Sequence, residues 1–497
     1  MSKTKVALVL SGGVSLGAYI AGALDELLRA FKAESKKYEI DIITGASAGA
    51  TTGALIAHGL RYREGATALH DIWVDSIDIT GLLAPDIPPS EPPSLLNPRR
   101  LRELAHGVIK WDDPADPGKR APYCSPDLRV AMAITNTTGL PYLSRIKEPA
   151  AGREEEFVQY RHAEQESFHL DRKQGPTSGL WQRMIEVALA SSAIPFVFPL
   201  VRLNRTAGDP DDDSQYIQKP SFEGEANFWY CDGGTFNNLP LDLVWYLTQK
   251  AGDRPAPAPG ERIIIVVNPW RNDFGEVDPN PPRPNFLHHA FGLLGALMAE
   301  SSAIEFQDEV VRVNKVVPAQ PAPRAQTPGA PRPHAEPVPP APRDFPGVPR
   351  PPEALLSDVA LVMPTKDDKR LKGNHLHAMG AFLDRTFREY DFRRGAADAR
   401  RVTVERLNLQ YDSGRRDSFY HPDDDPNLQQ DVSTYENLAT IPSTLDPNRS
   451  VQQVFEDALD KRIEAVVDRW NPPGPNWFDA LFVKAFVKSK LPEVWPQ

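Results

Sequence analysis

The strongest constraint on this chain is the alternation of apolar runs, glycine turns and amphipathic segments over residues 5–59. Val6–Leu10 is an apolar run that ends at a Ser-Gly-Gly turn, and Gly17–Phe31 then places its apolar residues at helical spacing. The order repeats with Tyr38–Ile43 as a second strand and Ala48–Gly59 as a second helix. Because strands that alternate with helices build layered folds, the sequence predicts an α/β protein of three α/β/α layers with a mostly parallel sheet.

Further apolar runs and helical patterns continue this alternation. Ile263–Val267 is the strongest additional strand, and Met184–Ser192 is a helix that ends before Pro195. The other predicted strands are Arg129–Thr135, Phe228–Cys231 and Leu355–Met363, and the other predicted helices are His375–Asp391, Val451–Trp470 and Trp477–Leu491.

The segment Pro318–Pro352 interrupts the pattern, because 14 of its 35 residues are proline. Proline restricts φ and lacks an N–H, so such a stretch packs neither as helix nor as sheet. We predict an extended linker or insertion here. Its P-x-x-P spacing also suits a protein partner that recognises polyproline.

Composition and charge narrow the classes of partner and compartment. The chain has 497 residues, of which 41% are hydrophobic, and a formal net charge of -11. The negative sign argues against nucleic-acid binding, which requires a basic surface. Cys124 and Cys231 have no metal-ligand spacing. We therefore expect no metal, no other cofactor and a reducing, cytoplasmic environment.

Residues 5–24 have two interpretations. The run KVALVLSGGVSLGAYIAGAL superficially resembles a secretory signal peptide, which would imply secretion. We favour a strand, a glycine loop and a helix, because the Ser-Gly-Gly turn breaks the apolar run where a signal core is continuous. Since no run of about 18 apolar residues occurs, we expect no transmembrane helix, and membrane contact would be peripheral.

The pentapeptide Gly45-Ala46-Ser47-Ala48-Gly49 lies between the second strand and the second helix. This G-x-S-x-G pattern is typical of a nucleophile elbow, a sharp turn that exposes a serine hydroxyl above the sheet. Gly45 and Gly49 let the chain double back, and the helix N-terminus places positive dipole beside the serine. Ser47 is therefore the candidate nucleophile, although the pattern alone also fits a structural turn.

A second glycine motif, SGGVSLG, ends at Gly17 and also lies between a strand and a helix. It lacks the lysine of a phosphate-binding P-loop, which argues against nucleotide binding. Successive backbone N–H groups in such a loop can converge on an oxyanion. Gly12, Gly13 and Val14 are therefore candidates for an oxyanion hole, and a tight turn without a ligand is the alternative.

A third motif, Asp232-Gly233-Gly234, follows an apolar strand. An aspartate at a strand end beside two flexible glycines can reach across a sheet to a serine, although Asp-Gly is also among the commonest turns. We expect Asn237 and Asn238 to order the loop that follows rather than to react.

Together the three motifs resemble the patatin-like phospholipase family. Ala188–Pro199, with the sequence ALASSAIPFVFP, is similar to a further segment of the family, and Gly380–Ala399 resembles a bacterial patatin-related subgroup. The resemblance implies a catalytic domain over 1–317, an insertion over 318–352, the closing part of the domain over 353–400 and a helical extension over 401–497.

The resemblance implies a lipid acyl hydrolase with a serine–aspartate dyad and no histidine. Ser47 would attack the ester carbonyl, and Asp232 would take its proton and later activate water on the acyl-enzyme. The substrate would be a membrane or micellar lipid, and we expect activity without calcium. Val14 and Leu16 replace a third glycine and a cation that many members carry, which makes neutral lipids and lysolipids as plausible as phospholipids.

Two other functions fit the same residues. One is an esterase or thioesterase with a Ser-His-Asp triad, whose histidine would lie downstream of Asp232. The candidates for it are His288, His289, His375 and His377. The other is a catalytically weak lipid-binding or scaffold protein that recruits a partner through the proline-rich segment. Retention of Ser47 and Asp232 argues against the scaffold.

Overall fold

The computed structural model describes residues 3–65, 67–87, 94–109, 119–148, 153–170, 179–207, 224–250, 262–270, 359–365, 371–409 and 422–470, with a few isolated residues between and after them. The proline-rich segment 318–352, His288 and His289 lie outside the described residues. So does the predicted helix Trp477–Leu491, apart from Lys484 and Val487.

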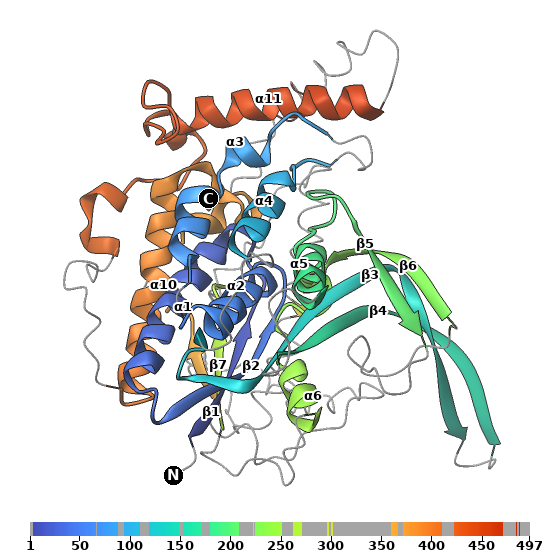
Figure 1. The fold of residues 1–497 in the computed structure, drawn as a ribbon. Helices are drawn as coiled ribbons and strands as arrows, with labels where there is room; N and C mark the ends of the chain where they lie inside the picture. Colours follow the sequence, from blue (N-terminus) through green and yellow to red (C-terminus); the bar gives the residue numbers. More distant parts are fainter. Residues whose placement is uncertain are drawn as a thin grey trace, which may run out of the picture.

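A mixed sheet of eight strands forms the centre of the described chain (Figure 1). Five strands run parallel in the order β3-β2-β1-β7-β8. Their bounds are Cys124–Glu148 for β3, Tyr38–Gly45 for β2, Thr4–Leu10 for β1, Arg262–Val267 for β7 and Val359–Val362 for β8. The antiparallel strands β4 (Arg153–Leu170), β5 (Val201–Ala207) and β6 (Gly224–Asp232) extend the sheet on the side of β3. The predicted, mostly parallel α/β sheet is confirmed.

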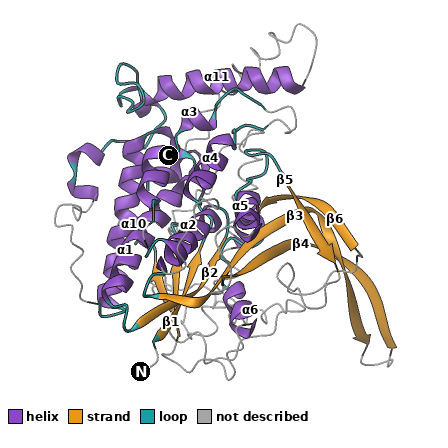
Figure 2. Cartoon of the chain, viewed as in Figure 1, coloured by secondary structure: helices purple, strands orange, loops and turns teal. Residues whose placement is uncertain are grey.

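Helices cover both faces of this sheet, which gives three layers (Figure 2). Because side chains of a strand alternate between faces, Val6, Leu8 and Leu10 join one core while Ala7 and Val9 join another. The first core is closed by α1 (Gly17–Ala33), α2 (Ala48–Tyr62) and α5 (Gly179–Ser191), and the second by α6 (Asp242–Lys250).

The elements after the proline-rich segment join the same sheet and core. Strand β8 pairs with β7, and α10 (Arg385–Glu405) packs along α1. The two helices approach closely at glycine, since a Cβ on Gly22 would lie 1.8 Å from the Phe392 carbonyl oxygen. The predicted helix His375–Asp391 is wrong in its bounds. It is broken into α9 (His375–Ala378), a 3-10 turn at Gly380–Leu383 and the start of α10, because Asp384 caps a new helix by accepting the Thr386 N–H at 2.9 Å.

The β3–β4 hairpin is much longer than the predicted strand Arg129–Thr135, and it projects from the layered body (Figure 1). A buried ion network holds its base to β5 and β6. Arg205 donates to Glu164 and Glu166, each at 2.9 Å, and to the Tyr230 hydroxyl at 2.8 Å. Because Tyr230 lies two residues before Asp232, this network also supports the strand that carries the candidate base.

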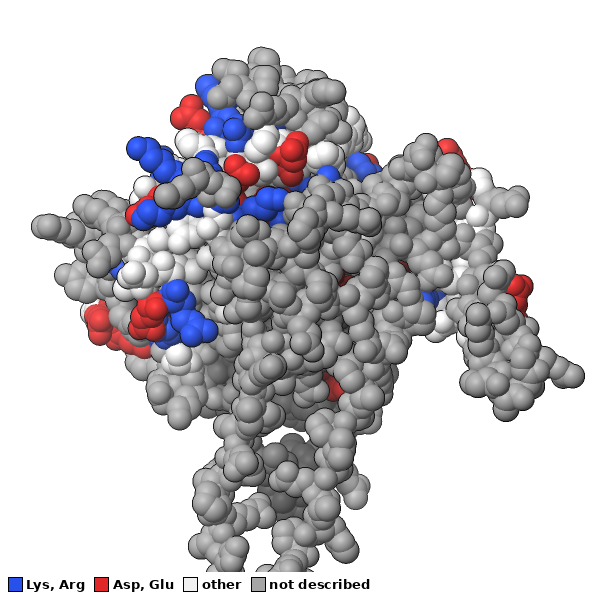
Figure 3. Space-filling model, turned by 90° about the horizontal axis from the view of Figure 1, so that it is seen from below, with Lys and Arg blue, Asp and Glu red and all other residues white. Residues whose placement is uncertain are grey.

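Described basic and acidic side chains lie next to one another on the face seen from below (Figure 3). Within the described residues, no helix combines the length and the apolar character that crossing a bilayer requires.

Helix α11 (Val451–Trp470) has the predicted bounds and ties the C-terminal extension to the rest of the chain. Its Arg462 is 2% exposed and donates to three backbone carbonyl oxygens, of Ala84 at 2.7 Å, Ser94 at 2.9 Å and Leu95 at 3.1 Å. These carbonyls belong to the segment between α3 (Ile79–Leu82) and α4 (Arg99–Val108), two helices that the sequence did not predict.

Arg462→Met should lower the free energy of unfolding by about 2–3 kcal/mol, because buried carbonyls lose a charged donor. Lys461→Met is the matched control, because Lys461 is exposed and pairs only across one helical turn with Asp457. It should change stability by no more than about 0.5 kcal/mol. Urea unfolding followed by circular dichroism measures both. Equal effects would contradict the bridging role of Arg462.

Candidate active site

Ser47 lies at the sharp turn between β2 and α2. Its backbone angles, φ 51° and ψ −126°, are rare for a residue other than glycine, and such strain persists only where the surroundings enforce it. Gly45 and Gly49 on either side of Ser47 have no room for a side chain. A Cβ on Gly49 would lie 2.3 Å from the Leu10 carbonyl oxygen, and one on Gly45 would lie 2.6 Å from the Gly49 carbonyl oxygen. The predicted strand-to-helix elbow is therefore present.

Strand register brings Asp232 to this turn. Strand β2 stops pairing with β3 at Gly45, which lies opposite Met132. Strand β6 then pairs with β3 two residues further along, with Asp232 opposite Ile134. Since β4 pairs with the other edge of β3, β6 occupies the edge that β2 leaves free. Asp232 thus sits where β2 would have placed residue 47.

The two side chains are in direct contact. The Ser47 hydroxyl donates to Asp232 Oδ2 at 2.6 Å, and the Gly234 N–H donates to Asp232 Oδ1 at 2.7 Å. Both residues are buried. Burial raises the pKa of Asp232 to about 7, while the hydrogen bonds from Ser47 and Gly234 act in the opposite direction. The carboxylate is therefore a stronger base than an ordinary aspartate.

The end of α5 holds the elbow in place, a role that sequence reasoning missed. The Ser47 N–H donates to Ser191 Oγ at 2.9 Å, and Ser191 donates to the Ala133 carbonyl at 2.6 Å. Ser192 Oγ donates to the Ser47 carbonyl at 3.0 Å, and the Asp232 N–H donates to the Ala193 carbonyl at 2.8 Å. The available signal was the ALASSAIP segment, which had been noted only as a family resemblance.

The glycine loop passes directly beside Ser47, since a Cβ on Gly12 would lie 3.1 Å from Ser47 Cβ. One of its predicted donors is already engaged, because the Gly12 N–H donates to the Asn238 carbonyl at 3.0 Å. Gly12 is thus corrected from an oxyanion donor to an anchor of the loop. Within the described chain, no such backbone bond engages the N–H of Gly13 or Val14. The Asn238 carbonyl thus links the loop after Asp232 to the glycine loop.

Val14 and Leu16 differ in what they do. Val14 has φ 52°, a conformation that glycine adopts readily and a β-branched residue rarely does. Leu16 is fully buried and packs towards Gly373, so its side chain lies in the core. Gly17 is also constrained, because a Cβ there would lie 2.1 Å from the Trp73 ring.

An apolar cavity of about 50 Å³ adjoins Ser47. The side chains that line it come from the glycine loop, α2, the segment around Trp73, α4 and the loop after α5. They include Val14, Leu55, Trp73, Leu104, Ile194 and Phe198. The contact between Ser47 and Asp232 is therefore polar, whereas the cavity next to it is lined mainly by apolar side chains and suits a hydrocarbon chain.

The described histidines do not stand between Ser47 and Asp232, because these two residues contact each other directly. Among the described residues, His70, Asp71 and Asp75 present ligand atoms within 4.8 Å of one another. His70 Nε2 lies 2.9 Å from Glu389 and its Nδ1 lies 3.2 Å from Asp75, and the hydrogen bond to Glu389 raises the pKa of His70. His70 therefore pairs with the carboxylates of Glu389 and Asp75.

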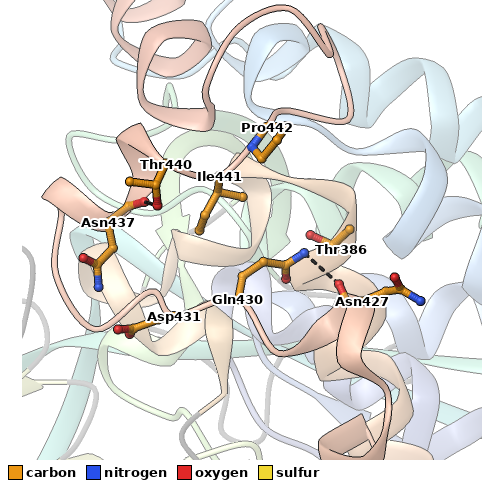
Figure 4. A pocket seen from close by; sticks show the side chains of 8 residues that line it. All are labelled: Thr386, Asn427, Gln430, Asp431, Asn437, Thr440, Ile441 and Pro442. Carbon is orange, nitrogen blue, oxygen red and sulfur yellow. Dashed lines mark hydrogen bonds between the residues drawn. The ribbon is translucent and has the colours of Figure 1, made fainter.

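A larger hollow of about 610 Å³ lies on the C-terminal part of the chain (Figure 4). It is lined by Thr386 of α10 and by residues of 427–442, among which Gln430 donates to the Asn427 carbonyl at 2.7 Å. The lining side chains offer amides, hydroxyls, the Asp431 carboxylate and the apolar Ile441 and Pro442 but no serine or cysteine, so the elbow remains the candidate active site.

The layered fold and the hydrogen bond between Ser47 and Asp232 place the chain among α/β proteins that carry a serine at a nucleophile elbow. The comparison with protein families is more specific, since residues 8–245 match the model of the patatin-like phospholipases. This range includes Ser47, Asp232 and the glycine loop. Residues 8–245 are therefore similar to the patatin-like phospholipase family.

Two individual proteins show weaker likeness. The uncharacterized membrane protein Rv3479 of Mycobacterium tuberculosis (strain ATCC 25618 / H37Rv) is 24% identical over 274 residues, which cover 54% of this chain and 24% of the relative. The chain thus spans about a quarter of that relative's length. The crystal structure of VipD from Legionella pneumophila aligns over 99% of this chain and 88% of VipD at 11% identity, with a TM-score of 0.29, too low to carry a structural argument.

The raised pKa of Asp232 predicts how the reactivity of Ser47 depends on pH. Below about 7 the carboxyl is protonated and cannot accept the serine proton, so reactivity should rise as pH increases through about 7. The rate at which a fluorophosphonate probe labels Ser47 measures this directly. A rate that stays flat between pH 5 and 9 would contradict the role of Asp232 as a base.

Ser191→Ala should slow the same labelling reaction by roughly tenfold or more, because the strained Ser47 backbone loses its side-chain acceptor and the hydroxyl shifts. Ser443→Ala is the control, since Ser443 is another buried serine and lies on the C-terminal part of the chain. It should leave the rate unchanged. Equal rates for Ser191→Ala and the unmodified chain would show that Ser191 does not position the elbow.

Proposed function

We propose that this chain is a lipid acyl hydrolase that cleaves fatty-acyl esters with Ser47 as nucleophile and Asp232 as base. The observation that carries the proposal is the buried 2.6 Å hydrogen bond from the Ser47 hydroxyl to Asp232 Oδ2. The family match over residues 8–245 supports lipid acyl hydrolysis in general, and the direct contact of Ser47 with Asp232 supports a dyad over a triad with an intervening histidine.

The geometry suggests how the residues would divide the reaction. Ser47 attacks the ester carbonyl as Asp232 takes its proton, and the alcohol leaves with that proton. Asp232 then activates water, which releases the fatty acid from the acylated serine. The N–H groups of Gly13 and Val14 stabilise the oxyanion, helped by the N-terminal dipole of α2 beside Ser47.

The surroundings of the pair favour a long apolar acyl group. The cavity beside Ser47 is lined mainly by aliphatic and aromatic side chains, which exclude water and gain stability when they contact hydrocarbon. Leu16 lies in the core, so the residue at this position does not face the headgroup. We infer a substrate in a membrane or micelle, and the geometry favours acyl-ester hydrolysis without selecting a headgroup.

The proposal is tested with a long-chain p-nitrophenyl ester and with mixed phospholipid vesicles. Ser47→Ala and Asp232→Asn should each reduce fatty-acid release by roughly 10³-fold or more. The first removes the nucleophile and the second removes the base, and neither residue works without the other. His375→Asn should retain activity, as should the unmodified chain after chelation of divalent metals.

Folding is checked by thermal unfolding at pH 8. At this pH Asp232 is ionised and desolvated. Because folding raises its pKa, the folded protein loses stability as pH rises from the unfolded to the folded pKa of this aspartate. Asp232→Asn should therefore be at least as stable as the unmodified chain. Hydrolysis that survives in Ser47→Ala would refute the nucleophile, and loss of activity in a folded His375→Asn would favour the triad.

A further inference from the structure

Two segments form the outer rim of the apolar cavity beside Ser47. Leu101, Leu104 and Ala105 of α4 line one side, and Ile194 and Phe198 of the loop after α5 line another. The segments are joined by a backbone hydrogen bond from the Leu96 N–H to the Val197 carbonyl at 2.7 Å. We call residues 96–105 and 194–198 the pocket rim.

Phe196 projects from this rim into solvent. Its neighbours Ile194 and Phe198 point into the cavity, whereas Phe196 is 80% exposed and has φ 67°. A positive φ is a strained conformation for a bulky aromatic residue, and it persists only where the surrounding structure enforces it. The fold therefore holds a large apolar ring in water, between two residues that line the cavity.

Helix α4 is amphipathic and loosely packed. Its apolar residues at 101, 104 and 105 follow helical spacing on one face, with Arg100 and Arg102 on the two flanks of that face. None of its described side chains is fully buried, so Leu101 and Leu104 remain partly in contact with solvent. An apolar stripe flanked by arginines is typical of a helix that lies in the plane of a lipid interface.

The pocket rim carries a net positive charge, although the whole chain is negative. Residues 96–105 contain three arginines and one glutamate, and residues 194–198 contain no charged residue, while the whole chain carries -11. Arg99 forms ion pairs with Asp86 and Glu103, each at 2.9 Å. The excess of arginine at the rim complements a surface that displays phosphate.

We propose that the pocket rim is a lipid-docking surface whose partner is the face of an anionic bilayer. Phe196 and the apolar face of α4 enter the acyl boundary, and the arginines contact lipid phosphates. This inference rests on the proposed function, because it places the mouth of the Ser47 cavity against the lipid that supplies the substrate.

The size of the cavity supports a coupling between docking and access. Its volume of about 50 Å³ is far below the roughly 300–1,000 Å³ of ordinary ligand sites. A long acyl chain can enter only if an element that lines the cavity moves. Helix α4 is loosely packed, so its displacement would break few buried contacts. A bilayer would cover the apolar face that such a movement exposes.

The test is flotation of the full chain with vesicles of phosphatidylcholine alone or of equal parts phosphatidylcholine and phosphatidylglycerol. All proteins carry Ser47→Ala, so that docking is measured without hydrolysis. Binding should be stronger on the anionic vesicles. Phe196→Asn, which removes the ring but tolerates a positive φ, should weaken it by roughly tenfold. Arg100→Gln with Arg102→Gln should weaken it by roughly 10–30-fold, and only on anionic vesicles.

Two variants keep the result interpretable. Phe196→Trp should retain binding, because tryptophan also partitions into interfaces. Tyr160→Asn, which removes an exposed aromatic side chain on the projecting β4 strand, should leave binding unchanged. Binding that is insensitive to Phe196 and the arginines, or lost only in Tyr160→Asn, would overturn the proposal. Because hydrolysis is tested through Ser47 and Asp232 and docking through the rim, either proposal can fail alone.

Discussion

The end of β2 at Gly45 leaves an edge of β3 unpaired, and β6 fills it. The contact between Ser47 and Asp232 depends on this replacement of β2 by β6 beside β3. It places Asp232 opposite Ile134, with its carboxylate 2.6 Å from the Ser47 hydroxyl. A shift of one residue in the β3–β6 register would turn the carboxylate to the other face of the sheet. The buried network around Arg205 and Tyr230 therefore matters to the site, because it holds β6 in that register.

Burial makes the Asp232 carboxylate a stronger base than an ordinary aspartate. A desolvated carboxylate is destabilised, which raises the pKa of Asp232 to about 7, and the hydroxyl of Ser47 and the N–H of Gly234 retain part of its charge stabilisation. The strained backbone of Ser47 is held by Ser191 and Ser192 from α5. Backbone strain and desolvation thus occur together at the contact between Ser47 and Asp232.

The elements after the proline-rich segment pack against the layered body, and one of their residues, Phe382, lines the cavity beside Ser47. Helix α10 packs on α1, and Arg462 of α11 fixes the segment that leads into α4. The arrangement leaves α4 as a lightly packed wall between the cavity and solvent, beside the exposed ring of Phe196. Arg462 anchors backbone carbonyls of the segment before α4, whereas α4 itself keeps its side chains partly exposed. The helix can therefore be loosely packed although the segment before it is held firmly.

Local patterns in the sequence determined the strands β1, β2 and β7, the helices α1, α2 and α11, and the elbow at Ser47. Each of these follows from the spacing of apolar residues or from a steric need for glycine, both of which act between near neighbours along the chain. The break before α10 was missed, because the cap by Asp384 outweighs the apolar periodicity.

Only the tertiary structure decided what depends on distant contacts. The hydrogen bond from Gly12 to Asn238 joins residues far apart in sequence, and it removed one predicted oxyanion donor. The role of Ser191 and the burial that raises the pKa of Asp232 have the same origin. Desolvation and hydrogen-bond partners are properties of what surrounds a residue in space, so the motifs identified Ser47 and Asp232 as candidates, while the packing determined their contact and the pKa of Asp232.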